Sequence, residues 1–205
     1  MTGVTRLECE DRGRLVSDAR FEDNYQIASG TNYATAIETM IDAGAAGLTY
    51  NFPSTTFTTP LLTFASEWDD RWAAAQDMGQ SIGNDLYFDG FGECTMTPEP
   101  TFTSTPVAQF NEGSNLVDAT VQQDRRTAYN RVIAYSSNSS LDQEYRGGAT
   151  DNDSSSPTYY FGPFGKRPRF YASPFLASTA QATSAAESVL NGQLGVARSV
   201  SVTAI

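Results

Sequence analysis

The amino-acid sequence predicts an α+β fold, in which a compact helix and hairpin unit is followed by a β-barrel-like domain with a late helix. Apolar residues recur at helical spacing in two segments, a capping box begins a third helical segment, and apolar and polar residues alternate, as in half-buried strands, in three others. Turn residues around Asp89 and Gly90 add a hairpin. The helical segments are residues 33–41, 68–82 and 178–190, the alternating segments are residues 4–10, 131–136 and 196–205, and the hairpin joins residues 86–88 to 94–96.

These segments indicate two kinds of domain. We assign one or more strands in residues 1–22 to a barrel-like domain that is shared with the C-terminal half. Residues 23–100 are expected to form the α+β domain, and residues 101–205 the β-barrel-like domain, with its helix near residues 179–190. With 205 residues, of which 40% are hydrophobic and 12% aromatic, the chain is long enough to bury such cores.

The predicted N-terminal strand, residues 4–10, places Leu7 and Cys9 on one face and charged residues on the other. A polar connector, residues 11–25, ends this strand or begins a short one. Residues 196–205 alternate in the same way and stop within the pattern. Because domains seldom begin and end inside strands, we expect the chain to be a piece of a longer protein.

The α+β domain is predicted to contain two helices. The first follows possible caps in residues 30–32, and glycines beyond residue 43 end it. Residues 48–64 are rich in threonine and contain two prolines, which places them at a sheet edge or in a hairpin. The second helix starts with a Ser-x-x-Asp pattern in residues 66–69, close to a capping box. Its buried stripe consists of Trp68, Trp72, Ala75, Gly79 and Ile82.

The C-terminal half begins after a linker-like crossing, residues 101–113. Strands are predicted at residues 116–122 and 131–136. The polar, glycine-bearing residues 136–153 indicate a loop or the tip of a hairpin. A capping box in residues 178–181 starts the last helix.

Composition excludes several functional classes. Thirteen basic and 24 acidic residues give a net charge of −11, which disfavours specific nucleic-acid binding. The chain has no histidine, so a Ser-His-Asp triad, a Cys-His pair and the usual catalytic zinc site are excluded. We therefore predict a protein that is not an enzyme, with no catalytic residues, no cofactor and no metal site.

Two cysteines, Cys9 and Cys94, are too few for a disulfide framework, and we expect two unlinked core thiols. The sequence leaves open whether they lie close together. The N-terminus lacks the basic and apolar regions of a signal peptide, and no apolar run approaches the roughly 20 residues that cross a bilayer. We expect a soluble protein made in a cytoplasm, with no membrane partner.

A group of carboxylates, Glu67, Asp69 and Asp70, stands beside Trp68 and Trp72. Paired carboxylates next to aromatic rings would suit an acidic glycosidase or a carbohydrate-binding module. Acidic residues are also typical of the first turn of a helix, where they meet its positive end. We favour this second interpretation, with both tryptophans in the core, and keep sugar binding as the alternative function.

Residues 151–156, Asp-Asn-Asp-Ser-Ser-Ser, are similar to the start of a calcium-binding loop. The glycine at its sixth position and the glutamate at its twelfth are missing, so a turn is favoured. Whether Asp151 and Asp153 bind a cation stays open.

Residues 158–175 combine seven aromatic residues, three prolines and three cations. The prolines disfavour a long helix or a regular central strand, and so many rings must pack on the core or on another protein. The cations could stack on nucleic-acid bases, but the negative chain favours cation–π contacts and pairing with carboxylates at a fold or subunit contact. We expect core anchors at Phe161, Phe164, Phe170 and Phe175. We predict a subunit or partner contact at Tyr159, Tyr160, Lys166, Arg167, Arg169 and Tyr171.

Several short motifs follow one another in a particular order. They are D-R-G-R-L-V-S-D-A-R-F, G-T-N-Y-A-T-A-I, T-T-P-L-L-T-F, the tryptophan helix, D-L-Y-F-D-G-F-G-E-C, Y-N-R-V-I-A-Y, T-D-N-D-S-S-S-P, F-G-K-R-P-R-F-Y-A-S-P-F and an alanine-rich helix. Each motif alone is unspecific. In this order, over nearly the whole chain, they resemble the tail-tip or baseplate hub protein family of tailed bacteriophages.

The resemblance implies a structural component of the virion, assembled in the bacterial host cytoplasm, that connects the tail tube to a spike or fibre through subunit contacts. It also implies two β-barrel-type domains joined to a smaller α+β part, and a homo-oligomer that is a trimer in the full-length protein. Family members are longer at both ends, so the chain would be a central fragment that lacks both termini. The host, the partner at the tip and the oligomeric state of this fragment stay open.

Overall fold

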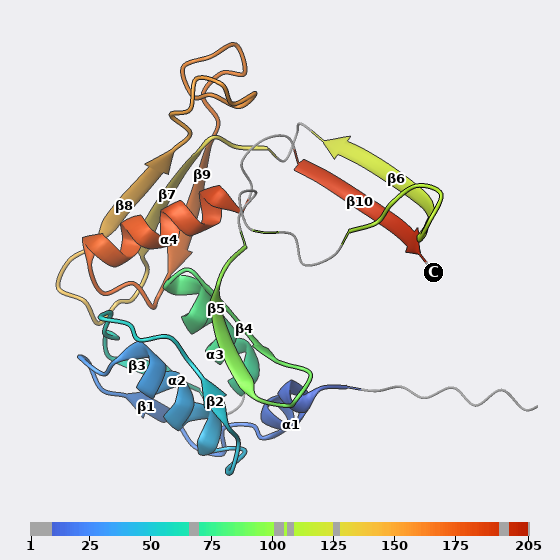
Figure 1. Ribbon diagram of the computed structural model, residues 1–205. Helices are drawn as coiled ribbons and strands as arrows, with labels where there is room; N and C mark the ends of the chain where they lie inside the picture. Colours follow the sequence, from blue (N-terminus) through green and yellow to red (C-terminus); the bar gives the residue numbers. More distant parts are fainter. Residues whose placement is uncertain are drawn as a thin grey trace, which may run out of the picture. The chain divides into compact units, whose positions relative to one another are not determined.

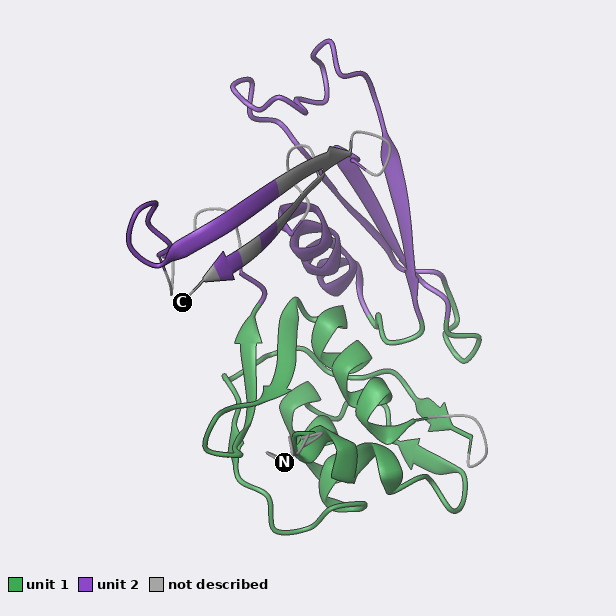
Figure 2. Cartoon of the chain, turned by 90° about the vertical axis from the view of Figure 1, so that its right-hand side faces the viewer, with its two compact units in different colours: residues 1–98, 138–143, 174–177 green, residues 99–137, 144–173, 178–205 purple. Residues whose placement is uncertain are grey.

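The computed structural model describes residues 10–65, 70–100, 105, 109–124, 128–192 and 197–204 of the chain. Within these ranges the chain forms four helices and ten strands, which confirms the predicted α+β class (Figure 1). The chain divides into two compact units (Figure 2). Unit 1 consists of residues 1–98, 138–143 and 174–177, and unit 2 of residues 99–137, 144–173 and 178–205.

Three capped helices form the helical part of unit 1. In each, an Asp or Asn side chain accepts a hydrogen bond from a backbone N–H of the first turn, which satisfies a donor that the helix itself leaves unpaired. The helices are α1 (Arg12–Asp18), α2 (Tyr33–Asp42) and α3 (Arg71–Ser81), and their caps are Asp11, Asn32 and Asp70.

The three helices match the sequence to different degrees. Helix α1 was not predicted, since its residues were assigned to a polar connector. Val16 is fully buried in it, but seven residues are too few to show a helical period. Helix α3 begins at Arg71, later than predicted, and the predicted start at residues 66–69 lies outside the described residues. Helix α2 lies where the sequence predicted it, and its apolar face is fully buried, with Tyr33, Ile37, Met40 and Ile41.

Unit 1 also contains two small sheets. Their strands are β1 (Tyr25–Ile27), β2 (Tyr50–Asn51), β3 (Leu62–Phe64), β4 (Asn84–Phe88) and β5 (Cys94–Pro98). β4 and β5 form the predicted antiparallel hairpin, and β2 joins β5 as a parallel edge strand. β1 and β3 pair as an antiparallel ribbon. The threonine-rich segment therefore supplies edge strands, as its prolines predicted.

Large side chains fill the core of unit 1. The rings of Phe21, Phe64 and Phe175 stack in series, with centroids 5.5 Å apart in the first pair and 6.3 Å apart in the second. The Tyr33 hydroxyl donates a hydrogen bond to the backbone carbonyl of Phe175. Phe175 is only 8% exposed, so its predicted role as a core anchor is confirmed.

The thiol of Cys94 is free and fully buried in this core, and burial raises its pKa to about 12. The predicted N-terminal strand, residues 4–10 with Leu7 and Cys9, lies outside the described residues except for Glu10. None of the described helices combines the length and the apolar character that crossing a bilayer requires.

Unit 2 consists of two sheets and one helix. Its elements are β6 (Leu116–Asp124), β7 (Arg131–Ser136), β8 (Arg146–Thr150), β9 (Pro168–Ser173), α4 (Thr179–Asn191) and β10 (Ala197–Ala204). β7 lies between an antiparallel β8 and a parallel β9, and β6 pairs antiparallel with β10. In contrast to the barrel-like domain that we expected, the described strands of unit 2 close no barrel.

Helix α4 packs closely on the sheet of β8, β7 and β9 through small side chains. Ser178 caps it by accepting a hydrogen bond from the Gln181 N–H, as predicted. A Cβ at Gly147 on β8 would lie 2.3 Å from the backbone nitrogen of Thr183, so only glycine fits there. This glycine also explains why the sequence indicated a loop instead of β8, since glycine is a poor strand former. The buried face of α4 carries Gln181, Ala182, Ala185, Ala186, Val189 and Leu190.

Candidate functional site

Residues 158–167, here called the aromatic loop, are held in place by the buried side chain of Asn130, which directly precedes β7. Its amide nitrogen donates to the carbonyls of Thr158, at 2.9 Å, and Gly165, at 2.8 Å. Its amide oxygen accepts from the backbone N–H of Arg167 at 2.9 Å. Three hydrogen bonds from one fully buried amide therefore tie both ends of the aromatic loop to the sheet.

The turn that precedes the aromatic loop is organised by Asp151. This residue is 4% exposed, and its carboxylate accepts hydrogen bonds from the hydroxyls of Ser156, at 2.6 Å, and Thr158, at 2.8 Å. Asp153 accepts from the hydroxyl and the backbone N–H of Ser155, and these bonds hold the pKa of its carboxyl below the usual value. Both carboxylates are thus engaged within the turn, and the described residues contain no cluster of three or more potential metal ligands.

Cations lie over the rings of the aromatic loop. The Lys166 ammonium is 5.1 Å from the ring centroid of Tyr160 and 5.6 Å from that of Phe161. The two rings meet edge to face at 5.1 Å. The guanidinium of Arg131 also lies over the ring of Tyr160, 5.6 Å from its centroid. Nη1 of Arg131 donates a hydrogen bond to the Tyr160 hydroxyl at 3.3 Å. A cation–π cluster of two cations and two rings results.

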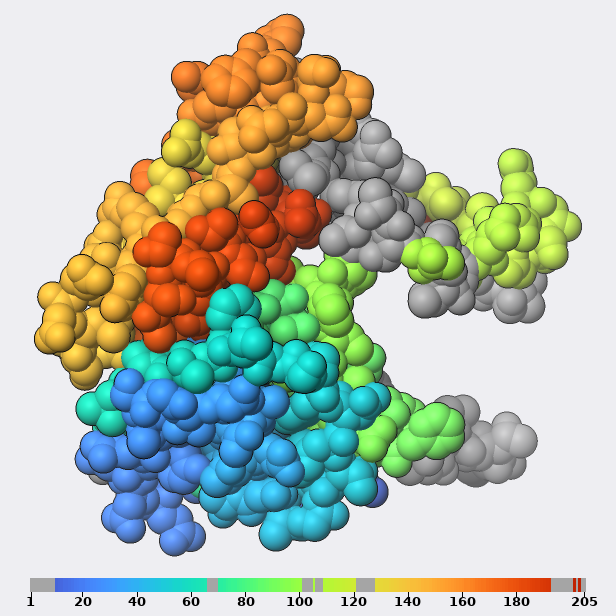
Figure 3. Space-filling view, turned by 60° about the vertical axis from the view of Figure 1, so that its left-hand side comes forward, coloured from blue at the N-terminus to red at the C-terminus, as the bar shows by residue number. Residues whose placement is uncertain are grey.

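This cluster is largely open to solvent. Phe161 is 64% exposed, so its predicted role as a core anchor is wrong. Phe170 is 60% exposed and was also wrongly predicted to anchor the core. Phe164 is half-buried beneath the guanidinium of Arg167, which lies 5.3 Å from its ring centroid. Figure 3 shows the orange residues around 151–165 gathered at the surface of unit 2.

The strand β9 explains why Phe170 is exposed. β9 is an edge strand that pairs with β7, and its residues alternate between the face that α4 covers and the opposite face, here called the outer face. Arg169 and Tyr171 pair with the buried residues Val132 and Ala134 and so share the helix side. Phe170 pairs with Ile133, so both lie on the outer face.

The predicted contact residues are therefore divided between two places. Tyr160 and Lys166 meet in the exposed cluster, and Tyr159 lies beside it with its ring 5.8 Å from that of Phe161. Arg169 lies elsewhere, stacked on Tyr129 at 4.9 Å with a hydrogen bond to its hydroxyl, and Tyr171 shares its side of the sheet.

Sequence reasoning missed the contribution of β7 to this surface. Arg131, Ile133 and Tyr135 share the outer face, and Arg146 on β8 lies 5.5 Å over the ring of Tyr135. The alternation of residues 131–136 was the available signal, because it places these three side chains on the face opposite the buried ones. The outer face thus adds further aromatic and cationic side chains to those of the aromatic loop.

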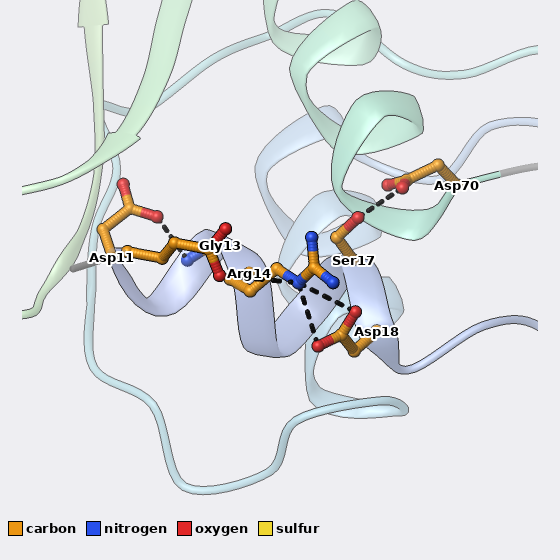
Figure 4. A network of polar contacts seen from close by, with 7 residues as sticks. Asp11, Gly13, Arg14, Ser17, Asp18 and Asp70 are labelled. Atoms are coloured by element: carbon orange, nitrogen blue, oxygen red, sulfur yellow. Dashed lines mark hydrogen bonds and ion pairs between the residues drawn. The ribbon is translucent and has the colours of Figure 1, made fainter. Parts of the chain in front are cut away.

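The carboxylate cluster near α3 has a structural role where it is described. Asp70 caps α3 by accepting from the Ala73 N–H at 3.0 Å, and it also accepts from the Ser17 hydroxyl of α1 (Figure 4). Burial alone would raise the pKa of Asp70, but hydrogen bonds from Ser17 and from the helix backbone hold it below its usual value. A general acid of a glycosidase requires the opposite shift. Glu67, Trp68 and Asp69 lie outside the described residues.

Trp72 likewise serves the fold. Its ring stacks on Phe88 with centroids 5.1 Å apart and packs against the core of unit 1. A Cβ at Gly13 of α1 would lie 2.8 Å from its indole nitrogen, so α1 approaches the ring closely. Trp72 is thus a partly buried residue at the edge of the core, which agrees with the core interpretation and not with an open sugar platform.

The structure was also compared with known proteins. No protein-family model matches the sequence, and a search of curated proteins by sequence finds no match. Among solved structures, the 43 kDa tail protein of prophage MuSo2 from Shewanella oneidensis is similar over 85% of this chain and 50% of its own, with a TM-score of 0.53 and 14% identity. The tail protein from Neisseria meningitidis MC58 is similar over 85% of this chain and 49% of its own, with a TM-score of 0.53 and 11% identity.

The chain thus spans about half the length of these two tail proteins. At such low identity the likeness concerns the fold, which extends through most of the chain. The protein shares its fold with a prophage tail protein and with a second tail protein.

Proposed function

We propose that the chain is a non-catalytic structural component of a phage tail. The observation that carries the proposal is the fold shared with two tail proteins over 85% of the chain. The order of the sequence motifs supports the same assignment independently. The capping role of Asp70 favours a structural function over the glycosidase alternative.

Within the tail, we infer a place at the tip, as part of a baseplate hub that joins the tail tube to a spike or fibre. The resemblance of the motifs to the hub family motivates this finer assignment. It implies that the full-length protein is a homo-oligomer, a trimer, and that its partners are other virion tail proteins.

We further propose that the aromatic loop and the outer face contribute to these subunit contacts. Exposed aromatic rings flanked by cations are typical of the centre of protein interfaces, where tyrosine, phenylalanine and arginine are enriched. The three hydrogen bonds of Asn130 limit the conformational entropy that the loop would lose on binding. Of the six residues predicted from the sequence, four belong to this surface, together with Phe161, Arg131 and Phe170; the four are Tyr159, Tyr160, Lys166 and Arg167.

Electron microscopy of phage particles that encode the protein tests its location. Gold-labelled antibodies raised against the purified chain are expected to bind at one end of the tail, opposite the capsid. Labels along the tube would retain the tail assignment and refute the place at the tip. Particles without any label, with the protein also missing from denatured virions in an immunoblot, would refute both.

A further inference from the structure

A pocket in unit 1 has no role in the fold or in the proposed contacts. Its volume is about 520 Å³. It is lined by Asp18, the last residue of α1, by residues 19–25, which follow α1, and by Ala43 and Gly44 at the end of α2. Arg71, the first residue of α3, also lines it. The pocket therefore lies where all three helices of unit 1 meet a buried cation.

The side chain of Arg71 is only 5% exposed and is held in a fixed orientation. Its Nε donates to the carbonyl of Ala19 at 2.8 Å, and its Nη1 donates to the carbonyl of Met40 at 2.7 Å. Its guanidinium lies 4.2 Å from the ring centroid of Phe21. The two carbonyls belong to the C-terminal ends of α1 and α2, where helices carry partial negative charge.

These contacts leave part of the guanidinium without a partner. No carboxylate of the described residues pairs with Arg71, and Asp18, which also lines the pocket, is paired with Arg14 at 3.0 Å. The Nη2 atom has no hydrogen-bond partner in the described part of the chain. Among the described residues, Nε of Arg131 is the only side-chain nitrogen or oxygen that is both fully buried and without a partner. Nη2 of Arg71 lacks a partner, so it cannot be fully buried. Nη2 is therefore open to the pocket that Arg71 lines.

We propose that this pocket binds a carboxylate group through the Nη1 and Nη2 atoms of Arg71. With Nε and one Nη1 hydrogen engaged, Nη1 and Nη2 retain hydrogens, and this fork can donate to both oxygens of a carboxylate. Stacking on Phe21 keeps the plane of this fork fixed. Burying a guanidinium without a counter-ion costs desolvation free energy, so the binding of an anion at this position is favourable.

The rim of the pocket defines the ligand further. It carries Glu22 and Asp23 beside Arg20, all exposed, so negative charge prevails outside the buried cation. A ligand with a cationic group next to its carboxylate complements both the buried guanidinium and the acidic rim, and it therefore fits the pocket better than a simple anion does. We therefore expect a peptide segment in which an acidic residue is adjacent to lysine or arginine.

Gly44 offers a way to alter the pocket without removing the charge. A Cβ at this position would lie 2.6 Å from Nε and 2.8 Å from Cδ of Arg71, so Gly44→Ala displaces the guanidinium. Gly90 is a matched control, because no atom lies within 4 Å of its added Cβ and its φ is not in the left-handed region.

The test is an NMR titration of the ¹⁵N-labelled chain at constant ionic strength, with acetate, N-acetyl-Lys-Glu-amide or chloride. We expect saturable shifts of the Arg71 Nε–Hε signal and of the amides of residues 19–25 with both carboxylates and none with chloride. The peptide should bind about threefold to fivefold more tightly than acetate, as befits a partly exposed charge pair. Gly44→Ala should abolish the shifts, and Gly90→Ala should retain them.

Two results would overturn the proposal. If the wild-type chain shows no saturable shift with either carboxylate, the pocket has no carboxylate site. If chloride produces the same shifts as acetate, the site does not recognise a carboxylate. Equal affinity for acetate and the peptide would overturn the assignment of a zwitterionic segment and support the arginine fork alone. Because the wild-type chain itself decides, a variant that fails to fold does not obscure the outcome.

Discussion

Unit 1 and unit 2 combine cations with aromatic rings in opposite ways. Arg71 of unit 1 is 5% exposed, stacks on Phe21 and donates to two carbonyls at helix ends. Lys166 of unit 2 is exposed, and one of the two rings beneath it, Phe161, is 64% exposed. The carbonyl acceptors account for the difference, because a cation can leave water only where other groups replace its hydration. Proximity to aromatic residues in the sequence therefore does not indicate whether a cation is buried.

The largest effect is expected when the buried cation of unit 1 is removed. Arg71→Met leaves the carbonyls of Ala19 and Met40 without a donor, and we expect a loss of about 3 to 4 kcal/mol in the free energy of unfolding. Urea denaturation followed by circular dichroism measures it. The control Arg14→Met removes an exposed cation that pairs with Asp18 and should cost much less, because solvent screens the pair. Equal losses in the two variants would contradict the distinction.

A smaller loss is expected for Asn130→Ala in unit 2. The variant removes three hydrogen bonds of a buried amide, which should cost about 2 to 3 kcal/mol. Hydrogen exchange should show faster exchange at the N–H groups of Tyr160 and Arg167. Asn152→Ala, at an exposed position of the same region, should stay within about 0.5 kcal/mol of the wild type. Unchanged exchange in the Asn130 variant would show that the aromatic loop is held by other contacts.

The cap of α3 predicts a pH dependence in unit 1. The pKa of Asp70 is lower in the folded chain than its unfolded value of about 3.9. Its carboxylate therefore contributes stability fully above that value, and the contribution is lost as the pH falls through the folded pKa. Asp70→Asn keeps a capping side chain but should flatten the decline of the unfolding free energy below about pH 4. An identical acid slope in both proteins would contradict this assignment.

The smallest effect on stability is expected at the exposed cluster. Lys166→Gln removes cation–π contacts that are worth about 0.5 to 1 kcal/mol at exposed sites, and we expect a change in unfolding free energy no larger than this. Thermal unfolding monitored by circular dichroism checks it. A loss as large as that of Arg71→Met would place Lys166 among the residues that hold the fold together.

Local patterns predicted much of the fold. The Ser178 cap, the apolar stripe from Tyr33 to Ile41 and the hairpin around Asp89 depend on residues close in sequence, and the structure confirms each of them. Helix α1 escaped prediction because it is short. Strand β8 escaped because its glycines reflect the close approach of α4, which no local pattern shows.

The candidate site was less predictable because it depends on distant residues. Asn130 meets the aromatic loop across 28 to 37 positions, and Arg71 meets the carbonyl of Ala19 across 52. The exposure of Phe170 follows from the register of β9 against β7, which the sequence of β9 alone does not contain. The sequence placed Tyr160 and Lys166 in one predicted contact, but it did not indicate Arg131, which lies with Lys166 over the ring of Tyr160.

Assembly of phage tails tests most directly whether the exposed cations and rings of unit 2 serve partners. A phage lacking the gene would be complemented with the wild type, with Phe161→Ser/Lys166→Gln, or with the control Arg14→Gln, and complete tails counted by electron microscopy. We expect the double variant to melt like the wild type and yet to yield far fewer complete tails, whereas the control should restore them. Full restoration by the double variant would contradict the account.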